Sequence, residues 1–472
     1  MRTPYARPST ASRRATHDPV RRALRLTPAR IRPPRARGRR ASRPCRRPGR
    51  TARARGQWRA RRRVLRRRSM SGDGPVVPFH QFVLKVHSRC NLACTYCYIY
   101  RSPDASWRER PARVSDDTVR RTAHRIAEHT AAHRLSRIRI ELHGGEPLLR
   151  GPEPVIAYAE AVRRAVSAVT TASTVTPVSP ATEVTATVQT NGTLLTRPAL
   201  DRLAAARIRV GLSLDGGTPA LNARRTDHAG RLSWPAASRA ARLLAEEYPA
   251  SYAGVLCTVD AATDPDEVYG SLAALRPPAV DFLLPHAHWG GARPGRFRPR
   301  PTPYGDWLAR AFDLWWQSPD GVRPRVRLFT EIVALLLGAE SAAESVGLSP
   351  LAAVVVDTDG SIEQVDSLKT AYAGAPGTGL DVTRNSFDEA LRHPGIAARH
   401  LGARALADEC LACPVLRVCG GGNYAHRYAT DSGFRHPSVY CADLERLIRH
   451  AAGRVAEQLP SVLTRTQSTH VL

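Results

Sequence analysis

The sequence predicts an α/β fold in which six strands and five helices alternate to form a partial (β/α)6 barrel. Between residues 79 and 289, short apolar runs alternate with longer amphipathic stretches. Right-handed crossovers between parallel strands would curl such a sheet into a full or partial barrel. Each unusual polar or glycine-rich motif of this region directly follows a strand, which is where barrel enzymes place their chemistry.

Each expected strand is a short run rich in β-branched and other apolar residues. FVLKVH opens the series, RIRIELHG alternates apolar and polar residues, and TEVTATVQTNG ends in the turn residues Asn and Gly. In chain order, we expect strands at 82–87, 137–144, 182–192, 209–216, 252–259 and 279–289.

Each expected helix is an amphipathic stretch between two of these runs. DDTVRRTAHRIAEHTAAH spaces its apolar residues three or four apart, which places them on one helical face. In chain order, we expect helices at 116–133, 155–169, 197–207, 237–247 and 266–275, and a further helical stretch at 304–337.

The formal net charge of +30 is concentrated in one terminal segment. Residues 1–70 hold 26 Arg and the single acid Asp18, a balance of +25, which leaves +5 for the rest of the chain. This composition predicts a disordered Arg-rich tail without the apolar core of a signal peptide. A nucleic-acid-binding arm, a targeting segment and a non-native extension upstream of a start at Met70 all remain open, and nucleic acid is not the partner we expect.

The remaining chain divides into three expected parts. Residues 78–300 form the barrel domain, 301–349 a helical linker, and 350–460 a second domain that carries cysteines. No run of 18 or more apolar residues occurs, so we expect a cytoplasmic protein with no membrane partner.

Seven of the nine cysteines fall into two tight groups, which favours metal ligands over disulfides. Cys90, Cys94 and Cys97 follow the first strand at a spacing that can ligate three irons of a [4Fe–4S] cluster and leave the fourth iron open. A structural zinc site with His87 as a fourth ligand is the alternative. Cys45 and Cys257 are expected to be unused thiols.

The first cysteine group and the motifs that follow later strands resemble the radical SAM (S-adenosylmethionine) superfamily. The resemblance rests on the CxxxCxxC pattern with Tyr96 before its last cysteine, on HGGEP (143–147), on QTNG (189–192) and on SLDG (213–216). It implies a cluster that binds and cleaves SAM, with Arg224 as an alternative to Arg225 among the contacts. The implied SAM-binding residues are Tyr96, Gly144, Gly145, Glu146, Asn191, Ser213, Asp215 and Arg225.

The second cysteine group resembles the SPASM extension of peptide-modifying radical SAM enzymes, which usually carries two auxiliary clusters. Two ligand positions of the first auxiliary cluster are occupied here by Val365 and Asn423. The resemblance therefore implies one auxiliary [4Fe–4S] cluster, and an all-cysteine zinc site is the alternative. Its implied ligands are Cys410, Cys413, Cys419 and Cys441.

Phrases such as FHQFVLKVHSRCNLACTYCYIY and VCGGGNYAHRY, spread over residues 78–458, resemble the FxsB family of peptide maturases. That resemblance implies a carbon–carbon (cyclophane) crosslink between an aromatic ring and a side-chain β-carbon of a ribosomal precursor peptide. A flavodoxin- or ferredoxin-type electron donor is implied as well. The alternatives are another SPASM activity, such as thioether formation or Ser/Cys oxidation, and a zinc-containing nucleic-acid-binding protein.

Asp366 is the expected catalytic base. It follows Val365, and it resembles the Asp that related enzymes place beside their substrates. It could instead cap the following segment or pair with Lys369, in which case Glu363 or the pair His286/His288 would be considered. His129 and His133 lie four apart on a helix without an accompanying HExxH glutamate, so we expect a solvated helix face rather than zinc ligands.

Overall fold

The computed structural model describes residues 77–171, 182–291, 301–341 and 343–468. Met1–Pro75 and Val76–Leu472 are separate units, and the description that follows concerns the second. The predictions for the Arg-rich tail, for Cys45 and for Met70 lie outside the described residues.

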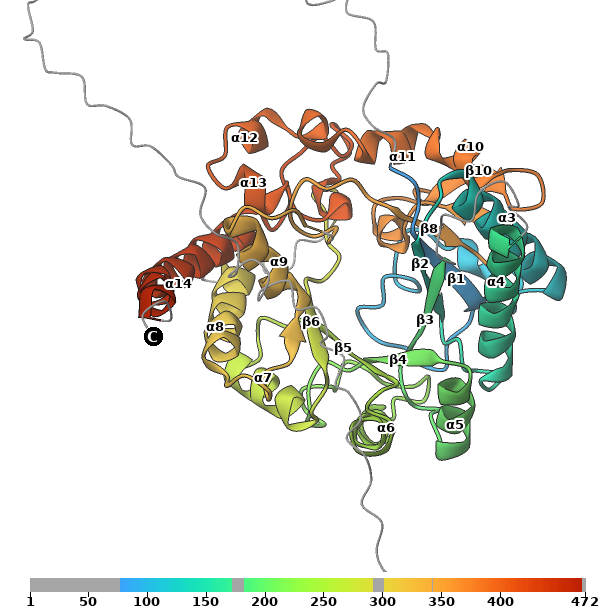
Figure 1. Cartoon of the computed structure of the whole chain (residues 1–472), viewed down its shortest axis with the longest axis horizontal. Coiled ribbons are helices and arrows are strands. Elements are labelled where there is room, and N and C mark those ends of the chain that lie inside the picture. Colours follow the sequence, from blue (N-terminus) through green and yellow to red (C-terminus); the bar gives the residue numbers. More distant parts are fainter. Residues whose placement is uncertain (1–76, 172–181, 292–300, 342, 469–472) are drawn as a thin grey trace, which may run out of the picture. The chain divides into compact units, whose positions relative to one another are not determined.

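A single ten-stranded sheet, in the order β10-β9-β8-β1-β2-β3-β4-β5-β6-β7, forms the centre of the second unit (Figure 1). Neighbouring strands from β1 to β7 pair in parallel, as the prediction of a parallel barrel requires. The strands of this parallel part are β1 (Gln81–His87), β2 (Arg137–Gly144), β3 (Glu183–Thr190), β4 (Ile208–Ser213), β5 (Tyr252–Thr258), β6 (Ala279–Leu283) and β7 (Arg325–Val326).

The five expected crossover helices lie on the outer side of the curved sheet (Figure 1). Ser115 and Thr196 cap two of them by accepting hydrogen bonds from backbone N–H groups of the first turn. Strand β6 ends at Leu283, earlier than the expected 289, because Pro285 has no N–H to donate to a ladder. The helices are α3 (Asp116–Ala132), α4 (Glu153–Thr171), α5 (Arg197–Ala205), α6 (Trp234–Glu247) and α7 (Pro265–Ala274).

Residues 301–349, expected as a linker, contribute helices that pack into the core of the barrel. Helix α8 (Pro303–Gln317) places Trp307 against Phe282 of β6, with ring centroids 5.2 Å apart. The buried residues of α8, α9 (Arg327–Leu336) and α14 (Cys441–Ser468) belong to the same hydrophobic core as those of the barrel strands.

The segment after residue 350 extends the barrel's own sheet. Strand β8 (Ala353–Val356) pairs in parallel with β1, and β9 (Ser361–Glu363) and β10 (Gly377–Asp381) continue as antiparallel neighbours. This pairing brings the 3-10 helix η2 (Asp366–Thr370) close to the end of β1. Short helices complete the segment: α10 (Phe387–Leu391), α11 (Pro394–Arg399), α12 (Asp408–Leu411) and α13 (Leu416–Cys419).

Among the helices in the described part of the chain, none is both long enough and apolar enough to span a membrane.

Candidate active site

The loop that carries the first cysteine group begins directly after β1. Cys90 Sγ accepts hydrogen bonds from the backbone N–H of Leu92, at 3.4 Å, and from Asn191 Nδ2, at 3.8 Å. Burial, with contributions from the nearby Glu146, Cys94 and Cys97, raises the pKa of Cys90 to about 12. The three thiols thus lie close enough to share one metal centre.

His87 is the fourth ligand that a zinc site at the first cysteine group would use. Its Nδ1 instead accepts a hydrogen bond from the Arg89 N–H at 3.1 Å. Among the described residues, the only group of three or more His, Cys, Asp or Glu ligand atoms that all lie within 4.8 Å of one another is His129, His133 and Asp388.

The second cysteine group lies on α12, on the turn between α12 and α13, at the end of α13 and at the start of α14. Cys419 lies within electrostatic reach of Cys410, Cys413 and Cys441. The turn after Cys419 requires glycine, because a Cβ on Gly420 would lie 1.7 Å from the Gly347 carbonyl oxygen. The Arg427 guanidinium donates to the carbonyls of all three glycines in that turn, at 2.8–3.0 Å. The remaining described cysteine, Cys257, is buried and its thiol donates to the Asp215 carbonyl.

The two glycines that end β2 pack against the start of the first cysteine loop. A Cβ on Gly144 would lie 2.2 Å from the His87 carbonyl oxygen, and one on Gly145 would lie 2.4 Å from that of Arg89. Any larger residue would therefore push the loop off the strand.

Glu146 links the ends of β2 and β3 from a fully buried position. Its Oε1 accepts from the Thr190 hydroxyl at 2.7 Å and the Leu148 N–H at 3.0 Å, while Oε2 accepts from the Asn191 N–H at 2.8 Å. Oε2 thus holds the backbone of Asn191, whose side-chain amide reaches Cys90.

A second group of expected SAM-binding residues surrounds Tyr96. Its hydroxyl donates to Asp215 and accepts from Arg225 Nη1 at 2.7 Å. Arg224 also contacts Tyr96: its guanidinium stacks over the ring at 4.6 Å and pairs with Asp260 at 3.1 Å. Both arginines therefore lie beside Tyr96. Ser213 lies nearby on β4, where its hydroxyl accepts from Gln189 at 2.9 Å.

A cavity of about 1030 Å³ runs along the inner face of the barrel. Val365 and Asn423, the two positions that lack a cysteine of the SPASM pattern, are part of its wall. His286 lines the cavity, whereas His288 packs against Tyr428 and does not. At the carboxyl ends of the strands, the cavity is lined by Tyr98, His143, His286, Glu344, Val365, Asp366 and Asn423.

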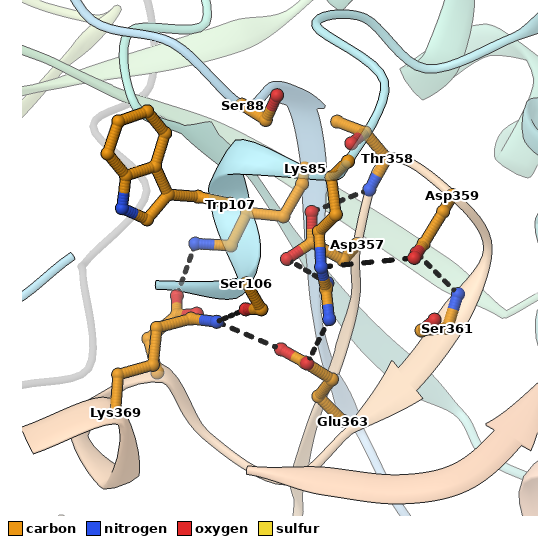
Figure 2. Close-up of polar contacts among 12 residues, drawn as sticks. Lys85, Ser88, Ser106, Trp107, Asp357, Thr358, Asp359, Ser361, Glu363 and Lys369 are labelled. Carbon is orange, nitrogen blue, oxygen red and sulfur yellow. Dashed lines mark hydrogen bonds and ion pairs between the residues drawn. The ribbon is translucent and has the colours of Figure 1, made fainter. Parts of the chain in front are cut away.

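Neither structural alternative for Asp366 is realised. Val365, not Asp366, is the N-cap of η2, and the ammonium of Lys369 pairs with Asp104 at 3.4 Å and Glu363 at 3.5 Å. Asp366 instead pairs with Lys85 of β1. Figure 2 shows Lys369 and Glu363 in the neighbouring ion-pair network, which keeps Glu363 away from the cavity.

The ionisable groups of the cavity differ in charge state at neutral pH. Burial lowers the pKa of His286 to about 4, and burial together with the Lys85 charge lowers that of His143 to about 3, so both imidazoles are neutral. Burial would raise the pKa of Asp366, but Lys85, with smaller contributions from His143 and Lys369, lowers the pKa to about 2. Asp366 is therefore an ionised base in this wall.

Three cavity features were not predicted from the sequence: the contact of Lys85 with Asp366, Tyr98 in the wall, and the contact of His143 with Lys85. A lysine within the otherwise apolar strand FVLKVH was the signal that could have pointed to Lys85.

The expectation that His129 and His133 lie on a solvated helix face is wrong. His129 is 2% exposed, and both rings share one oxygen of Asp388 from α10, at 2.6 and 2.8 Å. Helix α3 faces α10 on this side, so its histidines are covered by a part of the chain that lies some 255 positions later.

The comparisons with known proteins agree with this geometry. Residues 84–257 match the Radical SAM superfamily, a span that includes β1 to β5 and the first cysteine loop. The chain is 23% identical over 385 residues to a cysteine-type anaerobic sulfatase-maturating enzyme of Clostridium perfringens, covering 80% of this chain and 97% of the relative.

Two solved structures show a similar fold. One is native anSMEcpe with bound AdoMet and Kp18Cys peptide, with a TM-score of 0.65, 21% identity, and coverage of 82% of this chain and 99% of that chain. The other is Streptococcus suis SuiB bound to precursor peptide SuiA, with a TM-score of 0.51, 12% identity, and coverage of 81% and 80%. The predicted fold class, a radical SAM barrel with a SPASM-like C-terminal region, is confirmed.

Members of this superfamily use a [4Fe–4S] cluster together with SAM. The matched residues include both the first cysteine loop and the motifs at the strand ends. The protein is therefore an enzyme whose residues 84–257 match the Radical SAM superfamily.

Proposed function

We propose that the protein forms a carbon–carbon crosslink between an aromatic ring and a side-chain β-carbon of a ribosomally made precursor peptide. The observation that carries this proposal is the ionised Asp366 in the wall of a peptide-sized cavity at the strand ends. Closing a ring–carbon bond requires a base, because the ring must lose a proton to become aromatic again.

The chain offers a fitting site for the cofactors. Cys90, Cys94 and Cys97 would hold the SAM-binding [4Fe–4S] cluster. When bound, the reduced cluster and SAM supply a carbon radical that removes one hydrogen atom from the substrate. Two groups of side chains would hold SAM around this centre: Gly144, Gly145, Glu146 and Asn191 at the ends of β2 and β3, and Tyr96, Ser213, Asp215 and Arg225 at the end of β4.

The residues of the chain account for the rest of the reaction. The peptide loses two hydrogens in all: one as the hydrogen atom, and the other as a proton from the ring. Asp366 would accept that proton, and an oxidised iron–sulfur cluster, when bound, would supply the acceptor for the accompanying electron. Lys85 occupies Nδ1 of His143 at 3.0 Å, so we propose Asp366 as the base of this wall.

One auxiliary [4Fe–4S] cluster, held by Cys410, Cys413, Cys419 and Cys441, is the proposed electron acceptor. Val365 and Asn423 take the place of two ligands of a further cluster and line the cavity instead. The space beside Asp366 is then available to peptide. We propose a flavodoxin- or ferredoxin-type donor for the reducing electron, and the cytoplasm as the compartment, since reduced thiols and an open cluster persist there.

Oxidation of a Cys or Ser side chain on a protein is the second candidate. It is favoured by the similarity to the cysteine-type sulfatase-maturating enzyme over 97% of that relative's length. An aspartate base beside the substrate would serve that reaction as well, so the cavity does not discriminate between the two.

The test uses anaerobically purified protein, SAM, dithionite and the peptide encoded by a short reading frame beside the gene that ends in an aromatic-x-small motif. We expect a product lighter by two hydrogens, with an NMR correlation between a ring carbon and a β-carbon. Deuterium placed on that β-carbon should appear in 5′-deoxyadenosine. A product that reacts with hydroxylamine as an aldehyde would instead support side-chain oxidation, and Cys90→Ala is the control without product.

A further inference from the structure

Lys85 is a buried lysine that contacts two cavity residues without lining the cavity itself. It lies on β1 and is 4% exposed. Its ammonium donates to Asp366 Oδ2 and lies 3.0 Å from His143 Nδ1. Burying an ammonium costs several kcal/mol unless partners compensate for the lost water. Lys85 is therefore held in place by these two side chains.

The contact with Lys85 fixes the tautomer of His143. An ammonium has three N–H donors and no acceptor, so Nδ1 of His143 must accept the hydrogen bond. Because the ring is neutral, its single proton is then on Nε2. The ring lines the cavity, and its side chain is 23% exposed.

The same contact divides the two oxygens of Asp366 between two roles. Oδ2 is occupied by Lys85, while Oδ1 is buried and has no hydrogen-bond partner among the described residues. A buried carboxylate oxygen without a donor is costly. Its presence in a cavity wall favours a donor that arrives with the substrate.

We propose that Lys85 is the positioning residue of this cavity: it holds Oδ2 of Asp366 and Nδ1 of His143, so that Oδ1 and Nε2–H are presented together to the peptide. This inference rests on the proposed function. In the crosslinking step, Oδ1 accepts the ring proton, and Nε2–H donates a hydrogen bond to a peptide carbonyl. Lys85 touches neither peptide nor cofactor and acts through its two partners.

Lys369 provides a matched comparison within the same region. It is also buried, at 2% exposed, but its ammonium contacts Asp104, Ser106 and Glu363. Figure 2 shows Lys85 and Lys369 as separate cations, the second tied to the network of Glu363 and Asp357. If Lys85 only added stability to a buried site, replacing either lysine would have similar effects on the cavity.

Infrared difference spectroscopy of the holoenzyme reports the ionisation of Asp366 without any peptide. In Lys85→Met we expect a protonated-carboxyl band at pH 7 that is removed in the double variant Lys85→Met/Asp366→Asn. Wild type and Lys369→Met should lack this band, and Lys85→Arg, which keeps a cation, should lack it as well. An ionised Asp366 in Lys85→Met would overturn the inference.

Peptide modification gives the second readout. Lys85→Met should form product about 100-fold more slowly than wild type, which is a typical loss for a general base, and Lys85→Arg should recover part of it. Equal losses in Lys85→Met and Lys369→Met would mean a purely structural role and would contradict the inference.

Two measurements keep the result interpretable. If Lys85→Met does not fold, wild type and Asp366→Asn still decide: a protonated-carboxyl band at pH 6 in wild type that Asp366→Asn removes would overturn the inference. Formation of 5′-deoxyadenosine from SAM and dithionite, and identification of the peptide product, test the proposed function separately. A wrong product with the expected infrared bands would refute the crosslink but leave the role of Lys85 supported.

Discussion

Asp366 stays ionised inside a buried cavity mainly because of a partner that lies 281 positions earlier in the chain. Burial alone favours the neutral acid, yet the Lys85 ammonium holds the pKa at about 2. Burial lowers the pKa values of the neighbouring His143 and His286 imidazoles, so these rings are neutral. One wall of the cavity therefore combines a charged acceptor with neutral rings, an arrangement suited to accept a proton from a peptide.

The first prediction concerns Asp366 itself. Asp366→Asn keeps the size and most hydrogen bonding of the side chain but cannot take up a proton as a carboxylate does. We expect the variant to retain its iron and to form 5′-deoxyadenosine, while the yield of crosslinked peptide falls about 100-fold or more. Mass spectrometry of the peptide measures this. His288→Gln, outside the cavity, is the control, and normal crosslinking by Asp366→Asn would exclude the assignment.

The second prediction concerns the pH dependence. A carboxylate with a pKa of about 2 is deprotonated wherever the protein is folded, so protonation of this base should not limit the reaction. Product formation, measured as kcat/KM, should show no decline on the acidic side between about pH 8 and 5. A histidine base with its ordinary pKa would instead lose activity below about pH 6.5. A decline of that kind would point to a different base.

At the residue scale, the sequence indicated Asp366 through its place beside Val365, and the cysteines through their spacing. It could not indicate the partners of Asp366, because these contacts join β1, β2 and η2 across the fold. Both structural alternatives for Asp366 were local in sequence, whereas the actual partner was distant. In the sequence, only the charge of Lys85 within an apolar strand indicated that a buried partner was needed.

At the scale of elements, α3 and α10 are joined by a clamp made of His129, His133 and Asp388. His129 Nδ1 and His133 Nε2 lie 2.6 and 2.8 Å from the same oxygen, Asp388 Oδ1. Burial lowers the pKa of His129. For Asp388, burial would raise the pKa, but hydrogen bonds from His133 and His129 lower it. Helix α3 belongs to the barrel and α10 to the C-terminal segment, so the clamp fastens one to the other.

The third prediction is that this clamp makes stability depend on pH. The folded state keeps His129 neutral, whereas an unfolded chain takes up a proton near pH 6.5. The contribution of His129 to the free energy of unfolding is therefore present above that pH and is lost as the pH falls. The Asp388 contribution is lost only at lower pH, below about 3.9. We expect the melting temperature to fall from pH 7.5 to 5.5, and His129→Gln to weaken this dependence.

The size of the effect follows burial. The side chain of His129 is 1% exposed and that of His133 is 30% exposed. Losing a buried hydrogen bond costs about 1–3 kcal/mol, so His129→Gln should destabilise the protein more than His133→Gln. Equal melting temperatures for the two variants would show that the clamp contributes little.

Strands β1 to β6 were predicted from the sequence, whereas β7 to β10 were not. Strands β1 to β6 alternate with helices, and their apolar runs set them apart. Strand β7, of two residues, and β9, of three, carry too little pattern, and their pairing is decided by tertiary contacts. The pairing of β8 with β1 could not be predicted either, because the sequence of neither strand specifies its neighbour in the sheet.

At the scale of the whole molecule, one hydrophobic core extends from the barrel strands to α8, α9 and α14. Strands β8 to β10 add to the same sheet, so the cysteine-bearing C-terminal region and the barrel share their packing. Asp366 enters the cavity from that C-terminal region, while Lys85 comes from the barrel. The proposed site is thus complete only when both regions fold together.

The fourth prediction is that a chain beginning at Met70 retains the whole activity. The Arg-rich composition of the preceding residues cannot support a core, and Val76–Leu472 is a compact unit by itself. We expect this shorter protein to bind the same amount of iron and to form 5′-deoxyadenosine at the rate of the full chain. Lower iron content or slower SAM cleavage after truncation would assign the tail a role.

The fifth prediction concerns the metal content, which separates the proposed enzyme from a zinc protein. Three plus four cysteine ligands should hold two [4Fe–4S] clusters, or about eight irons per chain after anaerobic purification. Replacing Cys90, Cys94 and Cys97 with Ala should leave about four irons and abolish SAM cleavage. Air should damage the first cluster before the second, because its fourth iron has no cysteine ligand. About twelve irons would mean a third cluster with other ligands. Stoichiometric zinc in the second group would remove the proposed electron acceptor and, with it, this route to the crosslink.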